Sequence, residues 1–233
     1  MKKVNELQHF YNDKTSSIEI GIDEAGRGPL FGRVYTAAVV LPKNTNFKYE
    51  LLKDSKKFTS AKKIMEVYNY IKENALYWSI TYNDEKHIDK HNIRISTLNS
   101  MHESIKIIIN NNFLNNNISN VYILVDGNDF KPFTILKDDN MVEIPYITIE
   151  GGDNKFCSIA AASILAKVER DMYIKELCNK YEKLNLYYNL EKNKGYGTSA
   201  HIEGIKKNGI SPWHRVTYGL CKNAICNNEE FYL

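Results

Sequence analysis

The sequence predicts an α/β fold in which a mixed five-stranded sheet is flanked by helices. Ile18, Ile20 and Ile22 alternate with other residues, as in a strand that buries one face. Residues 121–125 form a continuous apolar run, which is typical of a central strand covered on both faces. Between these strands, apolar residues of the segment 95–109 recur at helical spacing. Strands and helices that alternate in this way predict helices packed on a sheet.

Three further segments complete the predicted sheet. Residues 34–41 are rich in Val, Thr and Tyr and are closed by Pro42, so we expect a second strand that runs antiparallel to the first. Residues 76–82 and 144–149 are the other two strands. We expect the strand at 121–125 to lie beside the first strand and parallel to it.

The predicted helices follow from apolar stripes and capping residues. Thr59 or Ser60 caps a helix over residues 61–74, and a second helix runs to about residue 112. A third helix extends from about Asp153 past Asp171, and its small residues allow close approach to a sheet. Two more helices are expected at about residues 172–184 and 199–208.

Composition limits the class of protein. The chain has 233 residues, of which 43% are hydrophobic and 25% charged, so a sizeable core is expected and global disorder is not. The net charge of +3 is mild, so partners must be argued from where charge gathers. Two basic clusters stand out, for which a solvated surface is the ordinary explanation: Lys53, Lys56, Lys57, Lys62 and Lys63, and Lys192, Lys194, Lys206, Lys207 and Arg215.

The sequence contains no signal for export or membrane insertion. The polar N-terminus lacks the apolar core of a signal peptide, and no apolar run is long enough to span a bilayer. The four cysteines lack zinc-like spacing, so free thiols in a reducing compartment are expected. We therefore predict a cytoplasmic protein.

Acidic residues stand where predicted strands end or helices begin. Asp23 and Glu24 end the first strand, Asp126 ends the strand at 121–125, and Asp153 opens a helix. Four carboxylates around one point fit two Mg²⁺ or Mn²⁺ ions, which suggests phosphodiester chemistry. Taken singly, each acid has a simpler explanation, such as a turn residue for Asp126 and a helix cap for Asp153.

A glycine turn follows the first acids directly. In Gly26-Arg27-Gly28 the glycines allow close approach to a ligand, and the guanidinium suits a phosphate. The alternative is a charged strand end that runs into an ordinary glycine loop.

Several motifs occur together and in a fixed order. They are Asp23-Glu24-Ala25-Gly26-Arg27-Gly28-Pro29-Leu30, Asp54-Ser55-Lys56-Lys57, Val125-Asp126-Gly127, the helical segment from Ser158 to Asp171, and Gly195-Tyr196-Gly197-Thr198. With these motifs the chain resembles ribonuclease HII, the type 2 ribonuclease H, over roughly residues 17–218. The resemblance implies the ribonuclease H fold, with an N-terminal arm at 1–17, a catalytic domain at 18–172 and a C-terminal helical extension at 173–233.

The resemblance also implies an activity. Members cleave the RNA strand of RNA–DNA hybrids and cut 5′ of single ribonucleotides embedded in duplex DNA, leaving 5′-phosphate and 3′-hydroxyl ends. Such an enzyme serves ribonucleotide removal and RNA primer removal. It acts with Mg²⁺ or Mn²⁺ ions on nucleic-acid partners, and the compact length resembles the bacterial single-chain form, for which we expect a monomer.

Site residues carry over by position. Asp23, Glu24, Asp126 and Asp153 match the catalytic, metal-binding acids. Gly26, Arg27 and Gly28 match the turn that reads the ribose 2′-hydroxyl, the group that distinguishes RNA from DNA. Tyr196 matches the ring that stacks on the sugar at the RNA-to-DNA junction, although a surface or packing tyrosine is the alternative. Lys56, Lys57 and Lys167 are candidate phosphate contacts, or simply solvated lysines.

Two positions depart from the family pattern. Arg33 stands where a small residue or proline is usual, which adds charge near the predicted site. Val216-Thr217-Tyr218 replaces a more basic ending after His214-Arg215, which predicts weaker grip on the nucleic-acid backbone. His201 and His214 receive no functional role. A hybrid-binding module without catalysis and a junction-resolving nuclease on the same sheet architecture are the competing hypotheses.

Overall fold

The computed structural model describes residues 6–12, 14, 16–44, 46–111, 114, 116–227 and 231. The chain forms two compact units. The first unit lies within residues 1–25, 36–81 and 98–168, and the second within residues 26–35, 82–97 and 169–233. The predicted division at residue 172 stays a prediction.

The central sheet has five strands in the order β3-β2-β1-β4-β7 and is mixed, as predicted. The strands are β1 (Ile18–Ala25), β2 (Val34–Val40), β3 (Tyr77–Asn83), β4 (Val121–Asp126) and β7 (Tyr146–Ile149). β1 pairs with β4 in parallel, with Ile22 opposite Val125, and β4 pairs in parallel with β7. The predicted neighbourhood of the first and fourth strands is therefore confirmed.

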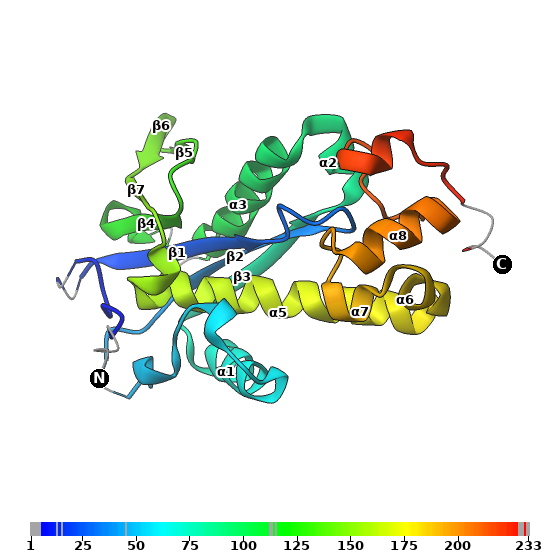
Figure 1. Ribbon diagram of the computed structural model, residues 1–233. Coiled ribbons are helices and arrows are strands. Elements are labelled where there is room, and N and C mark those ends of the chain that lie inside the picture. The colour runs from blue at the N-terminus through cyan, green and yellow to red at the C-terminus, as the bar shows by residue number, and fades with distance from the viewer. Residues whose placement is uncertain are drawn as a thin grey trace. The chain divides into compact units, whose positions relative to one another are not determined.

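Helices cover both faces of this sheet. Within the first unit, the buried residues Ile20 and Ile123 belong to a core that includes Leu98 and Ile105 of α3 (Ile93–Ile109). The opposite face packs on α5 (Cys157–Lys180), and a Cβ at Gly21 would lie 2.2 Å from the carbonyl carbon of Ser158. Figure 1 shows α3 and α5 on opposite sides of the sheet, with α1 (Ala61–Asn74) on the α5 side. Asp23 lies on the α5 side because it is one residue out of phase with Ile22.

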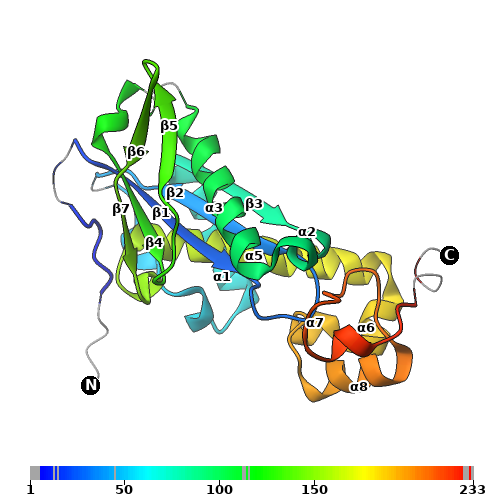
Figure 2. The same ribbon diagram turned by 90° about the horizontal axis from the view of Figure 1, so that it is seen from above.

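One β-hairpin was not predicted from the sequence. β5 (Phe133–Lys137) and β6 (Asn140–Ile144) form a separate antiparallel pair, visible in Figure 2 beside β7. Its turn holds Asp138 and Asp139 at φ of 49° and 60°, the left-handed conformation that two-residue hairpin turns favour. Pro145 lacks a backbone donor and separates β6 from β7, so the prediction of one strand over 144–149 was wrong at its start.

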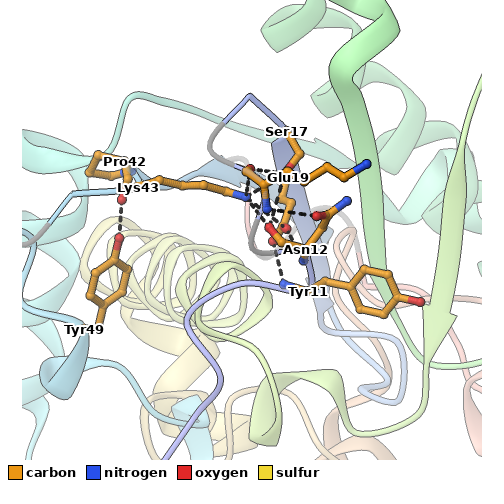
Figure 3. Close-up of polar contacts among 8 residues, drawn as sticks. Tyr11, Asn12, Ser17, Glu19, Pro42, Lys43 and Tyr49 are labelled. Carbon is orange, nitrogen blue, oxygen red and sulfur yellow. Dashed lines mark hydrogen bonds and ion pairs between the residues drawn. The ribbon is translucent and has the colours of Figure 1, made fainter.

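The described residues 6–12 of the N-terminal arm contain no helix. Gln8 accepts a hydrogen bond from Cys157 N at 3.0 Å and donates to Lys155 O at 2.8 Å. The buried Glu19 carboxylate accepts from Tyr11 N at 3.0 Å and Asn12 N at 2.7 Å, and it pairs with Lys43 at 3.5 Å (Figure 3). The arm is thus clamped to β1 and to the first turn of α5.

The second unit is built mainly from helices. They are the C-terminal part of α5, α2 (Glu85–His91), α6 (Glu182–Tyr188), α7 (Leu190–Asn193) and α8 (Ser199–Asn208). The predicted helix at 199–208 is confirmed. The predicted separate helix at 172–184 is wrong, because α5 continues without a break to Lys180.

Short 3-10 helices connect these elements, at Tyr49–Leu51, Ser55–Lys57, Ile118–Asn120, Gly152–Asn154 and Gly219–Asn223. Ser60 caps α1 by accepting a hydrogen bond from Lys63 N, as one of the two predicted caps. All four cysteines are free, as predicted. Within the described residues, no helix is both long and apolar enough to cross a bilayer.

Candidate active site and substrate turn

The four predicted acids lie at ends of elements in the first unit. Asp23 and Glu24 lie near the C-terminal end of β1, and Asp126 is the last residue of β4. Because β1 and β4 are parallel and Ile22 faces Val125, these three acids end neighbouring strands at one sheet edge. Asp153 is in the 3-10 turn Gly152–Asn154 that follows β7.

Backbone geometry holds Asp126 against the turn that carries Asp153. Asp126 Oδ1 accepts hydrogen bonds from Gly152 N at 2.6 Å and from Asp153 N at 3.4 Å. A Cβ at Gly152 would lie 2.6 Å from Ile159 Cδ1 and 3.2 Å from Asp126 Oδ1. Glycine at this position therefore permits the close approach of the two acidic segments.

The carboxyl of Asp23 is buried, with only 4% of the residue exposed. Its Oδ1 accepts a hydrogen bond from Glu24 N at 2.7 Å. Burial raises the pKa of Asp23 well above its usual value, and the negative charges of Glu24 and Asp126 raise it further. Ser163 on α5 donates a hydrogen bond that opposes this rise.

The pKa of Asp126 is raised in the same way, first by burial and then by the charge of Asp153. The hydrogen bonds from Gly152 and Asp153 oppose the rise. Repulsion thus links Asp23 with Glu24 and Asp126, and Asp126 with Asp153. Such a set of carboxylate oxygens suits a hard divalent cation, which would relieve the repulsion.

The side chains do not already form a complete metal shell. Among the residues that the structure describes, no group of three or more His, Cys, Asp or Glu is arranged so that it could hold a metal ion. The donor chemistry fits a divalent cation, and the carboxylates would have to rotate to surround one.

Two of the three lysines predicted as phosphate contacts, Lys56 and Lys57, contact the turn that carries Asp153 in the first unit. Lys56 Nζ is 3.5 Å from Asp153 Oδ2, and 78% of its side chain is exposed. Although burial lowers the pKa of Lys56, the charges of Asp153, Asp54 and Asp23 raise it overall. Lys57 Nζ donates to Asn154 Oδ1. Lys167 lies one helical turn beyond Ser163 on α5.

Asp54 and Asn154 join this cluster, and the sequence analysis assigned them no role. Asp54 accepts hydrogen bonds from Lys56 N at 2.9 Å and from Asn154 Nδ2 at 3.1 Å. Asn154 Nδ2 also donates to Asp153 Oδ1 at 3.0 Å. Burial raises the pKa of Asp54, but these hydrogen bonds and the charge of Lys56 outweigh it and lower the pKa overall. The signal in the sequence was the motif Asp54-Ser55-Lys56-Lys57.

The glycine turn follows Ala25 in the chain and belongs to the second unit. Gly26 has φ of 101°, and a Cβ there would lie 2.2 Å from Arg170 Nε. Arg27 and Gly28 are exposed. Arg215 is fully buried and donates hydrogen bonds to five carbonyls of this turn: Gly26 at 2.6 Å, Arg27 at 3.0 Å, Pro29 at 2.8 Å, Gly32 at 2.8 Å and Arg33 at 3.3 Å.

This geometry corrects the sequence analysis of Arg215. It is not part of a solvated basic surface, because its guanidinium is 0% exposed and organises the turn from behind. Arg170 adds a second brace by donating to Arg33 O at 3.2 Å, Phe31 O at 3.1 Å and Lys194 O at 2.9 Å. Burial lowers the pKa of Arg215 to about 10, which still leaves it charged at neutral pH.

The loop of Tyr196 lies against the same turn. Gly195 adopts φ of 84°, and its carbonyl accepts a hydrogen bond from Leu30 N at 2.9 Å. A Cβ at Gly28 would lie 3.5 Å from Tyr196 Cε1, and Tyr196 is 50% exposed. The second unit therefore brings the predicted turn and the predicted stacking ring together.

The two departures from the family pattern also have structural roles. The guanidinium of Arg33 lies over the rings of Tyr82, at 3.9 Å, and Tyr173, at 4.3 Å. Val216 N and Thr217 N each donate to the Asp89 carboxylate of α2 at 2.9 Å. Both segments are therefore anchored within the second unit.

Comparison with known proteins decides the family. The model of the family described as Ribonuclease HII matches residues 20–221. The chain belongs to the ribonuclease HII family. Ribonuclease HII of Parabacteroides distasonis is 41% identical over 207 residues, which cover 89% of this chain and 92% of that protein. Ribonuclease HII of Bacteroides thetaiotaomicron is 39% identical over 210 residues, which cover 90% of this chain and 94% of that protein.

The fold is also that of solved members. The crystal structure of ribonuclease H2 from Pyrococcus horikoshii superposes with a TM-score of 0.66 at 21% identity, over 88% of this chain and 95% of that one. Membership of this family makes the chain a ribonuclease H, a hydrolase that acts as an endonuclease on RNA–DNA hybrids. The family match extends over residues of both units.

Proposed function

We propose that the protein is a metal-dependent endoribonuclease that cuts 5′ of ribonucleotides embedded in duplex DNA and within RNA–DNA hybrids, leaving 5′-phosphate and 3′-hydroxyl ends. The observation that carries the proposal is the cluster of Asp23, Glu24, Asp126 and Asp153, in which burial and then mutual repulsion raise the pKa of Asp23 and Asp126. Such a cluster is unfavourable by itself and becomes favourable when it binds cations.

We propose Mg²⁺ or Mn²⁺, two ions in the substrate complex, as the cofactor. A bound pair of this kind activates water and stabilises the leaving 3′ oxygen. A related structure supports the choice of ion, since it is described as ribonuclease HIII in complex with Mn²⁺, with a TM-score of 0.59, 19% identity, and coverage of 90% of this chain and 70% of that one. All four proposed ligands are hard oxygen donors, as these ions prefer.

The residues of this chain have separate tasks in the proposed reaction. The backbone of Gly152 orients Asp126 through the 2.6 Å hydrogen bond, so that one carboxylate oxygen stays directed away from the turn. Lys56 neutralises Asp153 before the cations arrive and is then free to contact a phosphate. Lys57 and Lys167 are proposed as further phosphate contacts.

The second unit is proposed to recognise the substrate. Arg215 draws the turn carbonyls inward, which leaves the exposed Arg27 and Gly28 for the ribose 2′-hydroxyl and its phosphate. The half-exposed Tyr196 ring is proposed to stack on the sugar of the next nucleotide. A flat ring and a 2′-hydroxyl contact together would select the RNA-to-DNA junction.

We also propose the biological setting. An enzyme of this specificity serves removal of misincorporated ribonucleotides and RNA primers, acts as a monomer on nucleic acid and works in the cytoplasm. We propose a catalytic domain at 18–172 with a helical extension at 173–233.

A cleavage assay on matched duplexes tests the proposal. Duplexes that contain one ribonucleotide, four ribonucleotides or none are incubated with Mg²⁺, with Mn²⁺ or with a chelator. We expect cuts on the 5′ side of the ribonucleotide, only with metal and only when a ribonucleotide is present. Metal-independent duplex binding without cuts would support a binding module instead. Cuts in branched all-DNA substrates alone would support a junction nuclease.

A further inference from the structure

Two histidines in the second unit are buried against each other. His201 is 0% exposed and His214 is 1% exposed, and their Nε2 atoms lie 3.0 Å apart. At this distance one nitrogen must donate a proton and the other must accept it. The proposed function uses neither residue.

The contacts of the two Nδ1 atoms decide which histidine donates across the Nε2–Nε2 contact. His201 Nδ1 lies 3.0 Å from the Tyr196 carbonyl, which can only accept, so His201 carries its proton on Nδ1. Its Nε2 is therefore the acceptor, and His214 Nε2 donates. His214 Nδ1 is then an acceptor, which agrees with its 3.0 Å contact to Ser211 N, a group that can only donate.

A continuous chain of hydrogen bonds results. It runs from Ser211 through His214 and His201 to the carbonyl of Tyr196, and it exists in this form only when both rings are neutral. Ser211 Oγ, at 2.8 Å from His214 Nδ1, adds a second donor at the far end. We call this chain the histidine relay.

The relay ends on the loop that presents the Tyr196 ring. The Tyr196 carbonyl accepts from His201 and also from Thr198 N at 2.8 Å, while Tyr196 N donates to Asn193 O at 3.0 Å. The peptide groups on both sides of the ring are thus held, although the side chain is half exposed. A ring anchored at its backbone loses less rotational freedom when it stacks on a ligand.

We infer that His201 and His214 are positioning residues that hold the Tyr196 ring in place for the RNA-to-DNA junction. The inference rests on the proposed function, in which Tyr196 contacts the sugar. The two histidines act through the backbone of Tyr196 and do not touch the substrate.

The surroundings of the relay favour the neutral rings. Tyr188 packs at 4.7 Å from the His214 ring and 5.8 Å from the His201 ring, and Phe31 packs at 5.1 Å from His214. The Tyr188 hydroxyl donates to Gly209 O. Burial lowers the pKa of both histidines, and the charge of His201 lowers the pKa of His214 further.

The charged group next to the relay in the chain is Arg215, which is also buried and cationic. A proton added to His201 would place two N–H donors face to face across the 3.0 Å contact between the rings, and a proton added to His214 would place a donor at Nδ1 against the Ser211 N–H. The relay is therefore intact at neutral pH and is lost in acid.

The test compares His214→Phe, which removes the donor, with His214→Gln, whose amide Nε2 can donate in its place. The readout is a ratio: kcat/KM for a duplex with one ribonucleotide divided by kcat/KM for a continuous RNA–DNA hybrid. Any effect of a substitution on the four acids changes both values alike and cancels in the ratio. We expect H214F to lower this ratio at least fivefold and H214Q to lower it less than twofold. As the pH is lowered below 6.5, the ratio should fall in the wild type once the lowered pKa of the buried pair is reached, and it should stay flat in H214Q, because the amide can turn its oxygen toward a protonated His201.

The same substitution in a Tyr196→Ala background separates positioning from general damage. With the ring absent, H214F should change the ratio less than twofold. A fivefold loss in the double variant would mean that His214 acts elsewhere, and an unchanged ratio in the single variant H214F would overturn the inference. If Y196A itself leaves the ratio unchanged, the proposed role of Tyr196 fails instead.

A second readout does not depend on cleavage. Nitrogen-15 NMR of the folded protein should report the Nδ1–H tautomer for His201 and the Nε2–H tautomer for His214, and H214F should shift the Tyr196 ring signals. The opposite tautomers, or Tyr196 signals that do not move, would overturn the inference whatever the cleavage assay gives.

Discussion

Arg215→Lys tests whether the substrate turn depends on one buried guanidinium. Arg215 makes five hydrogen bonds to backbone carbonyls, and an ammonium has three donors, so at least two of these hydrogen bonds are lost. Each hydrogen bond to a charged group contributes about 1.5–3 kcal/mol, so the loss of two predicts a destabilisation of roughly 3–6 kcal/mol. For a chain of this length we expect the melting temperature to fall on the order of 10 °C.

Calorimetry and the matched-duplex assay measure the two consequences. We expect the cleavage rate at a single ribonucleotide to fall at least tenfold, while Mn²⁺ affinity changes less than twofold, because the four acids are in the other unit. The exposed Lys206 offers a matched control, and Lys206→Ala should change the free energy of unfolding by less than about 0.5 kcal/mol. A melting temperature for Arg215→Lys within 2 °C of wild type would refute the reasoning.

Three further predictions concern the acids and the histidines. Asp126→Asn keeps the acceptor for Gly152 N but removes the carboxylate charge, which its neighbours repel. The metal-free variant should therefore melt at the same or a higher temperature than the wild type, while its cleavage rate falls at least 100-fold. A melting temperature several degrees lower would contradict the repulsion. Gly152→Ala should destabilise the protein by about 1–3 kcal/mol and slow cleavage at least tenfold, because its Cβ would clash with Ile159 Cδ1. The second substitution Ile159→Val removes that Cδ1, so the double variant should regain part of the stability in a thermal melt. The pKa of His214 is lowered in the folded state, so the stability that comes from the neutral ring is present above the unfolded value near 6.5 and is lost as the pH falls. The melting temperature of the wild type should therefore fall more between pH 7 and pH 5 than that of His214→Gln. Equal falls would count against a buried neutral His214.

The sequence predicted the sheet well because its strands differ in pattern from its helices. The alternation of Ile18, Ile20 and Ile22 and the apolar run of β4 locate the buried strands and hence the acids at their ends. The β5–β6 hairpin was missed because its turn is Asp138-Asp139, without the glycine that usually marks such turns. The continuity of α5 through Lys180 was missed because its apolar run gives way to the charged residues Glu169, Arg170 and Asp171.

Only those residues of the candidate site that lie in short sequence motifs could be predicted. The acids, the glycine turn and Tyr196 stand in recognisable segments. Arg170 and Arg215 act on residues far away in the sequence, with Arg215 some 180 positions from the turn, and a single basic residue gives no sign of its burial. Asp54 and Asn154 required the fold in the same way, since they are 100 positions apart and meet through one hydrogen bond.

Anomalous diffraction from crystals grown with Mn²⁺ and a duplex containing one ribonucleotide tests the central claim most directly. The account predicts manganese peaks bound by the carboxylates of Asp23, Glu24, Asp126 and Asp153, and their loss in Asp126→Asn. Manganese bound elsewhere, with these four side chains directed apart in a complex that still cleaves, would contradict it.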